Sequence, residues 1–251
     1  MRNGNGEARP CVCRWTWTAL GIAAALAAAM PGAAAAQDEF DGPRINYTLY
    51  GGAAVDGYET NIQILGATVR PSGNGLRPMA GLQAYRLGFE DATGGTEVFA
   101  VNPSVGGGYF TPDGQVSAMV GYSFVNEDVP VPVFGGGGGE SGLTTSVQGL
   151  YWGASPDVEA IAAYSWEPEY LWTNLVVAQP VMGMGNGTLS LGVDGVYEEQ
   201  MIENGSSAYS VGPLVRWSND LNLGVTLAGG YRKAEDREST WYVRLGAAFY
   251  Q

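Results

Sequence analysis

The sequence has 251 residues and a formal net charge of -13, with 39 Gly, 11% aromatic residues and only 15% charged residues. So acidic a chain repels phosphate backbones, which excludes nucleic acid from the expected partners. The share of Gly is about twice the average of roughly 7%, which argues against long helices. Gly and aromatic residues in short alternating segments favour a β-barrel instead.

Residues 1–36 read as a cleavable signal peptide. A positive stretch with Arg2, Arg9 and Arg14 precedes an apolar run from Ala19 to Met30, and three alanines, 34–36, form a small-residue cleavage site before Gln37. The apolar run is too short to span a membrane securely, although a retained N-terminal anchor is the alternative. We therefore expect a signal peptide over 1–36, a short segment over 37–43 and a barrel over 44–251.

The expected mature chain contains no His and no Cys, because Cys11 and Cys13 both precede the apolar run. Without imidazole or thiol there is no Ser-His nucleophile and no nitrogen or sulfur metal site. We expect no enzyme activity, no catalytic or metal-binding residues and no cofactor. A hydrolase with two carboxylates stays open, with Glu167 and Glu169 as the nearest pair, but solvated charges beside a turn are the favoured interpretation.

Alternation of apolar and polar residues, bounded by turn formers, predicts twelve strands. Their approximate ranges are 44–55, 60–70, 78–90, 96–110, 115–125, 143–153, 157–166, 169–181, 187–197, 207–217, 221–232 and 239–250. The fourth is the weakest, because Pro103 and three consecutive glycines, 106–108, interrupt it. The pattern predicts a closed antiparallel up-and-down transmembrane β-barrel of about 12 strands, with 10 or 14 as alternatives.

The last predicted strand carries the membrane signal. Its apolar face begins at Trp241 and ends at Phe249, eight steps that span roughly 26 Å at about 3.3 Å per residue. Strand tilt reduces this length to roughly 20 Å, close to the apolar band of an outer-membrane barrel, which aromatic girdles border. The tenth strand repeats the spacing, so the expected girdle residues are Tyr209, Trp217, Trp241 and Phe249.

The connections alternate between compact turns and acidic loops, as expected of a barrel with short periplasmic turns and longer outer loops. With the N-terminus in the periplasm, residues 126–142 form the longest outer loop. Its Pro-Val-Pro-Val-Phe segment is stiff and its five glycines are flexible. The loop is either unstructured or folds over the mouth of the barrel.

Five charged residues fall on the predicted inner faces of strands. A charge that faces lipid at mid-depth costs about 2 to 4 kcal/mol for Arg, so these side chains should point inward. They form either an ion-pair network that fills a narrow lumen or a constriction that selects a solute. The residues are Arg86, Glu159, Asp194, Arg216 and Arg244, and Asp194 is expected to pair with Arg216.

Three segments of the C-terminal half carry a family resemblance: VQGLYWGASP, SVGPLVRW and LAGGYRKAEDRESTWYVRLGAAF. Over roughly Ser146 to Phe249 the chain resembles the alphaproteobacterial outer-membrane barrels named for the cellulose-biosynthesis protein BcsS. The resemblance implies a barrel of 10 to 12 strands associated with exopolysaccharide, without catalytic residues. The usual signal for the barrel-assembly machinery ends in an aromatic residue, whereas Gln251 follows Tyr250 here.

Two functions are consistent with the sequence. One is a non-enzymatic outer-membrane barrel accessory to exopolysaccharide (cellulose) production or secretion and to biofilm formation, as the resemblance implies. The other is a small passive, porin-like channel for small solutes. An open bore would favour the channel, and a lumen filled by side chains would favour the accessory role. The expected partners are outer-membrane lipids, the barrel-assembly machinery and a polysaccharide or its secretion machinery.

Overall fold

The computed structural model describes residues 44–251 except 59, 92–93, 127–128, 134–136, 140, 153–154, 168, 202–205 and 236. The predicted signal peptide over 1–36 and the segment 37–43 lie outside the described residues. Within the described part of the chain, no helix is long and apolar enough to cross a membrane.

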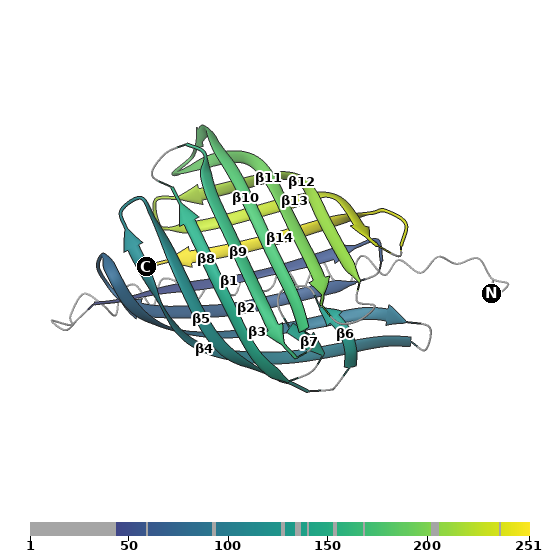
Figure 1. Cartoon of the computed structure of the whole chain (residues 1–251). Helices are drawn as coiled ribbons and strands as arrows, with labels where there is room; N and C mark the ends of the chain where they lie inside the picture. The colour runs from purple at the N-terminus through teal and green to yellow at the C-terminus, as the bar shows by residue number, and fades with distance from the viewer. Residues whose placement is uncertain are drawn as a thin grey trace.

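The described chain forms a closed antiparallel barrel of twelve strands, shown in Figure 1. The strands of the barrel are β1 (Ile45–Asp56), β2 (Asn61–Pro71), β3 (Gly75–Asp91), β4 (Gly94–Thr111), β5 (Gly114–Val125), β8 (Gly142–Tyr151), β9 (Asp157–Trp166), β10 (Glu169–Met184), β11 (Gly187–Gln200), β12 (Ser207–Asn219), β13 (Leu223–Ala234) and β14 (Thr240–Tyr250). Each strand pairs with its neighbour along the chain, and β1 pairs with β14 to close the barrel. The predicted fold class and strand number are therefore confirmed.

The connection between β5 and β8 contains a hairpin that the sequence did not predict. Strands β6 (Val129–Val133) and β7 (Gly137–Gly139) form a separate two-stranded antiparallel sheet. Figure 1 places this sheet at one end of the barrel, next to β9 and β10. The connection is thus partly ordered by its own backbone hydrogen bonds.

The two ends of the barrel differ in their connections. At one end, hereafter the turn end, the strands are joined by short turns at 72–74, 112–113, 152–156, 185–186 and 220–222, and the described chain begins and ends there. At the other end, hereafter the loop end, the connections include 57–60, 126–141, 201–206 and 235–239. This arrangement matches the predicted alternation of turns and loops.

The pairing of β1 with β14 shows which side chains share a face, and the buried Tyr242 marks the inward one. Ala54 lies opposite Arg244 and Gly52 opposite Gly246, while Ala53 lies opposite Leu245 on the other face. Because side chains alternate along a strand, Tyr242 and Arg244 point into the barrel, whereas Trp241 points outward. The same continuous register runs through β2, β3 and β4.

Candidate functional site in the barrel interior

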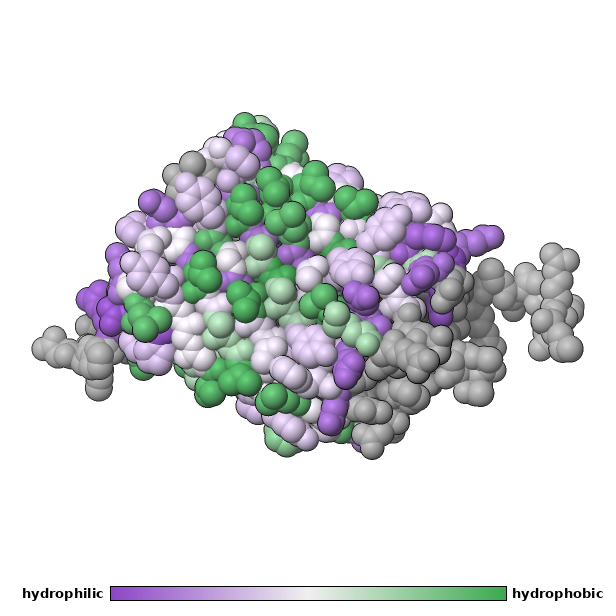
Figure 2. Space-filling model, viewed as in Figure 1, coloured by the Kyte–Doolittle hydropathy of each residue, from purple (hydrophilic) through white to green (hydrophobic). Residues whose placement is uncertain are grey.

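The outward face of the barrel is apolar along most of its length. Figure 2 shows hydrophobic side chains gathered over the wall that contains β8 to β12, with hydrophilic side chains toward its ends. The exposed apolar residues on this wall include Val147, Leu175, Leu191, Val193 and Val215. So large an exposed apolar surface is unfavourable in water, and a closed barrel satisfies every backbone group in lipid. The barrel is therefore built to span a membrane.

The four predicted girdle residues all lie on the outward face. Tyr209 is 47% exposed and Trp241 is 50% exposed. Phe249 is only 8% exposed, and its ring packs against that of Tyr47 with centroids 5.9 Å apart. The indole nitrogen of Trp217 donates to the carbonyl of Met184 at 3.4 Å, near the turn end.

The interior carries a ladder of charged side chains on one wall, formed by β9 to β14 and β1. Each ion pair in this ladder joins strands that are not neighbours in the sheet. Such contacts form only across the concave side of a curved sheet, because adjacent strands are about 4.8 Å apart. The ladder therefore lines the lumen, at three heights between the two ends.

The first cluster lies nearest the loop end and is centred on Arg232 of β13. Its Nε lies 3.1 Å from a carboxylate oxygen of Asp56 on β1, and its Nη1 and Nη2 donate to both oxygens of Glu198 on β11, at 3.0 and 3.2 Å. The Tyr170 hydroxyl donates to Glu198 at 3.0 Å, and Arg232 also donates to the Ser210 hydroxyl. All five side chains are buried. One guanidinium thus neutralises two buried carboxylates only in part.

The second cluster surrounds Asp194 of β11, which is completely buried. Its carboxylate accepts hydrogen bonds from the Asn174 amide at 2.8 Å, from the Tyr242 hydroxyl at 3.2 Å and from the guanidinium of Arg244. Asn174 also donates to the backbone carbonyl of Gly195. Three donor side chains from two strands, β10 and β14, therefore fix the position of a single buried negative charge.

The third cluster lies toward the turn end and is more hydrated. Arg216 of β12 donates to Glu159 of β9 at 3.0 Å and to the Thr226 hydroxyl at 3.3 Å. The side chains of Arg216 and Glu159 are 23% and 22% exposed. Tyr250 also points inward and is 44% exposed. The lumen near the turn end therefore admits water.

The opposite wall of the interior carries an apolar cluster toward the loop end. Leu87 and Val98 are almost completely buried and form a core cluster with Ile62, Tyr85 and Ala100. Uncharged polar groups on this side of the interior also bond to one another: Tyr85 lies 3.2 Å from the Ser123 hydroxyl, and the Asn102 amide donates to the Thr144 hydroxyl at 2.9 Å. Side chains on this wall and in the ladder are thus buried in the half of the barrel toward the loop end.

Two predictions about the inner charges are wrong. Arg86 lies opposite Gln63 and Phe99 in the sheet, and its chain neighbours Tyr85 and Leu87 are the inward-facing residues, so Arg86 faces outward. Asp194 does not pair with Arg216, because β11 and β12 place Asp194 opposite Gly212, four residues away from Arg216. That offset is about 13 Å along the strand.

The other predicted charges do point inward, but with different partners. Glu159 and Arg216 contact each other, and Asp194 contacts Arg244. The cluster around Arg232 is not predicted because the expected strands end at residues 55 and 197, whereas Asp56 and Glu198 lie in β1 and β11. Asp194 and Val196 are the last two inward positions of the expected strand 187–197. If the same alternation continued for two more residues, it would place Glu198 inward as well.

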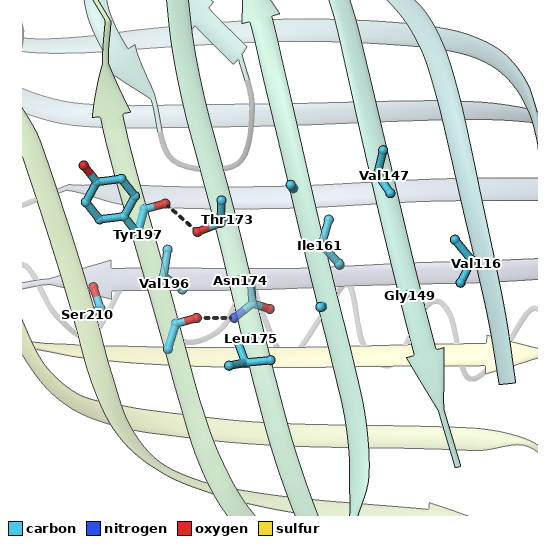
Figure 3. A pocket seen from close by; sticks show the side chains of 13 residues that line it. Val116, Val147, Gly149, Ile161, Thr173, Asn174, Leu175, Val196, Tyr197 and Ser210 are labelled. Atoms are coloured by element: carbon cyan, nitrogen blue, oxygen red, sulfur yellow. Dashed lines mark hydrogen bonds between the residues drawn. The ribbon is translucent and has the colours of Figure 1, made fainter. Parts of the chain in front are cut away.

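A shallow apolar groove of about 550 Å³ crosses the wall over β5 and β8 to β12. Small residues, including Gly149, Ala160 and Gly195, lower the surface between larger side chains such as Val147 and Leu175. Figure 3 shows that the groove lies over Asn174 and its hydrogen bond to the Gly195 carbonyl. Most of its lining residues, such as Val147 and Leu175, lie on the outward face, while Asn174 and Ser210 face inward.

The described residues contain no group of three or more carboxylates, His or Cys that could hold a metal ion. Glu167 and Glu169, the candidate carboxylate pair, are both exposed at the connection between β9 and β10. The chemical groups that line the interior are thus ion pairs and hydroxyls, most of them buried and the rest in the hydrated region near the turn end.

The chain matches no protein-family model and no curated protein. Among solved structures it is similar to the beta domain of the Bordetella autotransporter BrkA, with 12% identity and a TM-score of 0.49 over 83% of this chain and 99% of that one. It is also similar to OccK10 of Pseudomonas aeruginosa, with 11% identity and a TM-score of 0.38 over 84% and 99%. The translocator domain of the Neisseria meningitidis autotransporter NalP gives 11% identity and 0.31 over 93% and 98%. The shared feature is the β-barrel fold.

Proposed function

We propose that this chain is a non-enzymatic outer-membrane barrel that does not conduct solutes and that assists exopolysaccharide (cellulose) production or secretion. The observation that carries the first part is the burial of side chains on both walls of the barrel toward the loop end. There Arg232, Glu198 and Tyr170 are buried against one another, and Val98 and Leu87 are buried on the facing wall. Side chains that line a water-filled pore would remain solvated instead.

The polysaccharide part of the proposal is supported by the resemblance of residues 146–249 to the BcsS barrels. The absence of imidazole and thiol in residues 37–251 favours a role in binding or assembly over a catalytic one. The apolar belt supplies contact with lipid, and folding into the outer membrane would use the barrel-assembly machinery.

A passive channel is the second candidate, and the hydrated region around Tyr250, Arg216 and Glu159 favours it. Conduction through planar bilayers separates the two functions. The full chain, purified from membranes, should give no stable single-channel steps in a potassium chloride solution. Regular ohmic steps would show an open bore and would favour the channel.

The polysaccharide role needs a separate test in the host cell. Deletion of the gene should lower the amount of cellulose at the cell surface, measured by dye binding, and the wild-type gene supplied in trans should restore it. Unchanged cellulose in the deletion strain would contradict this part of the proposal and leave the closed barrel unaffected.

A further inference from the structure

Among the residues that the structure describes, two arginines at the turn end have no carboxylate partner, unlike the arginines of the charged ladder. Arg70 lies near the end of β2 and Arg77 near the start of β3, on either side of the turn at 72–74. The register places both on the inward face, because Thr68 and Gly81 pair on that face and alternate with Val69 and Ala80. Both guanidinium groups therefore lie at the mouth of the lumen.

Arg70 and Arg77 differ from the arginines of the ladder in the groups that they contact. Arg216, Arg232 and Arg244 each contact a carboxylate. Among the described residues, Arg70 and Arg77 form no ion pair with any carboxylate, although the whole chain has 25 Asp and Glu residues against 12 Lys and Arg. Continued past the pair Val69 and Ala80, the register sets Arg77 two residues from the position opposite Arg70, so the two like charges are neighbours. Two neighbouring positive charges without a counter-charge are unfavourable unless an anion joins them.

The surroundings hold both groups in place and leave hydrogen-bond donors free. The guanidinium of Arg70 stacks on the ring of Phe110, 3.8 Å from the centroid, and donates one long hydrogen bond of 3.4 Å to the carbonyl of Pro71. The Nε of Arg77 is buried without a hydrogen-bond partner. Stacking fixes the plane of a guanidinium while its edge still presents donors in a fork.

The turn between the two arginines is shaped for this arrangement. Gly73 has a φ of 103°, which side chains rarely adopt. A Cβ at Gly73 would lie 2.8 Å from the Nη2 of Arg77, so the glycine leaves room for the guanidinium. The position of Arg77 therefore depends on the absence of a side chain in the turn.

We propose that Arg70 and Arg77 form a binding site for an oxyanion at the mouth of the lumen. The ligand would carry at least two oxygens that share a negative charge, as a phosphate or a carboxylate does, because a guanidinium binds such groups through two parallel hydrogen bonds. A soluble anion and the phosphate of a lipid headgroup have the same chemistry. This site goes beyond the proposed function and does not depend on it.

Equilibrium dialysis of the full chain in a non-ionic detergent tests the site, with radioactive inorganic phosphate as the probe at constant ionic strength. We expect saturable binding of one phosphate per chain. Each of the variants Arg70→Gln and Arg77→Gln should weaken binding by about 10-fold or more, the loss expected for a charge-assisted hydrogen-bonded contact. Arg237→Gln is the matched control, because Arg237 is exposed at the loop end and the change in net charge is the same.

Folding of every variant is checked by the different gel mobility of folded and boiled samples. If Arg77→Gln does not fold, Arg70→Gln and Arg77→Lys still test the site, since lysine keeps the charge but loses the fork. A second arm adds micelles with phosphatidylglycerol: loss of bound phosphate would identify the lipid headgroup as the ligand, and unchanged binding would identify a soluble anion. Absence of saturable binding, or equal affinity in wild type and both Gln variants, would overturn the proposal.

Discussion

Loss of the cation in the cluster around Arg232 should lower the free energy of unfolding much more than loss of one of its two anions. Arg232 faces two carboxylates, Asp56 and Glu198, at 3.0 to 3.1 Å, and all three are buried. Replacement of Glu198 by Gln leaves a neutral pair of Arg232 and Asp56. Replacement of Arg232 by Met leaves two buried carboxylates that share no cation in the cluster.

The expected magnitudes follow from these contacts. Glu198→Gln converts charge-assisted hydrogen bonds into neutral ones and should lower the free energy of unfolding by about 1 to 2 kcal/mol. Arg232→Met should lower it by about 3 to 5 kcal/mol, the usual cost of leaving a buried charge without its partner. The triple variant, with Asp56→Asn and Glu198→Gln added to Arg232→Met, contains no charge in the cluster and should recover part of this loss.

Urea unfolding in detergent micelles, followed by tryptophan fluorescence, measures these differences. Arg237→Gln is the control, because an exposed substitution usually changes stability by less than about 0.5 kcal/mol. If Arg232→Met costs no more than Glu198→Gln, or if the triple variant is the least stable of all, then the cluster does not hold one cation between two anions and the reasoning fails.

Two further predictions concern the interior and the orientation of the barrel. A double-mutant cycle of Asp194→Asn with Arg244→Gln should show a coupling free energy of about 0.5 to 3 kcal/mol in urea unfolding, because the two side chains form an ion pair. The effects of Asp194→Asn and Arg216→Gln should instead add within about 0.5 kcal/mol, because Arg216 pairs with Glu159. The reverse result would contradict the observed pairing. A membrane-impermeant maleimide should label Glu167→Cys at the loop end on intact cells but not Asp220→Cys at the turn end, and labelling of Asp220→Cys alone would reverse the predicted orientation.

The strands could be predicted because lipid imposes a strict condition on the outward face. Outward positions are mostly apolar, with Arg86 as an exception, so alternation is visible even in short segments and predicts all twelve strands of the barrel. The fourth was weak for a physical reason. Pro103 lacks a backbone donor, and the pairing of β4 with β5 is interrupted between Val101 and Ser104. Strand β6 alternates Val with Pro and β7 consists of three glycines, so neither shows the alternation of apolar and polar residues that predicts a strand.

The charged interior could be predicted only in part, because its ion pairs join strands that are not adjacent in the sheet. The inward position of Glu159 and Arg216 followed from alternation, but their contact spans β9 to β12 and depends on barrel curvature and on the reach of Arg. If only adjacent, hydrogen-bonded strands are considered, different ion pairs are expected. Arg86 was misplaced because the residues around it, from Leu82 to Leu87, include apolar side chains on both faces of β3.

The distribution of charge inside the barrel suggests how an anion would reach Arg70 and Arg77. The carboxylates of the ladder lie on the wall formed by β9, β11 and β1, whereas the two arginines lie on β2 and β3. At physiological ionic strength charges interact over about 8 Å, so an anion at the mouth is attracted to the nearby arginines and is repelled by Glu159 only if it moves across the lumen. In the proposed non-conducting barrel, the buried residues around Arg232 would stop the anion from passing further toward the loop end. An anion would thus be held at the turn end, which is the behaviour of a binding site and differs from that of a conducting pore.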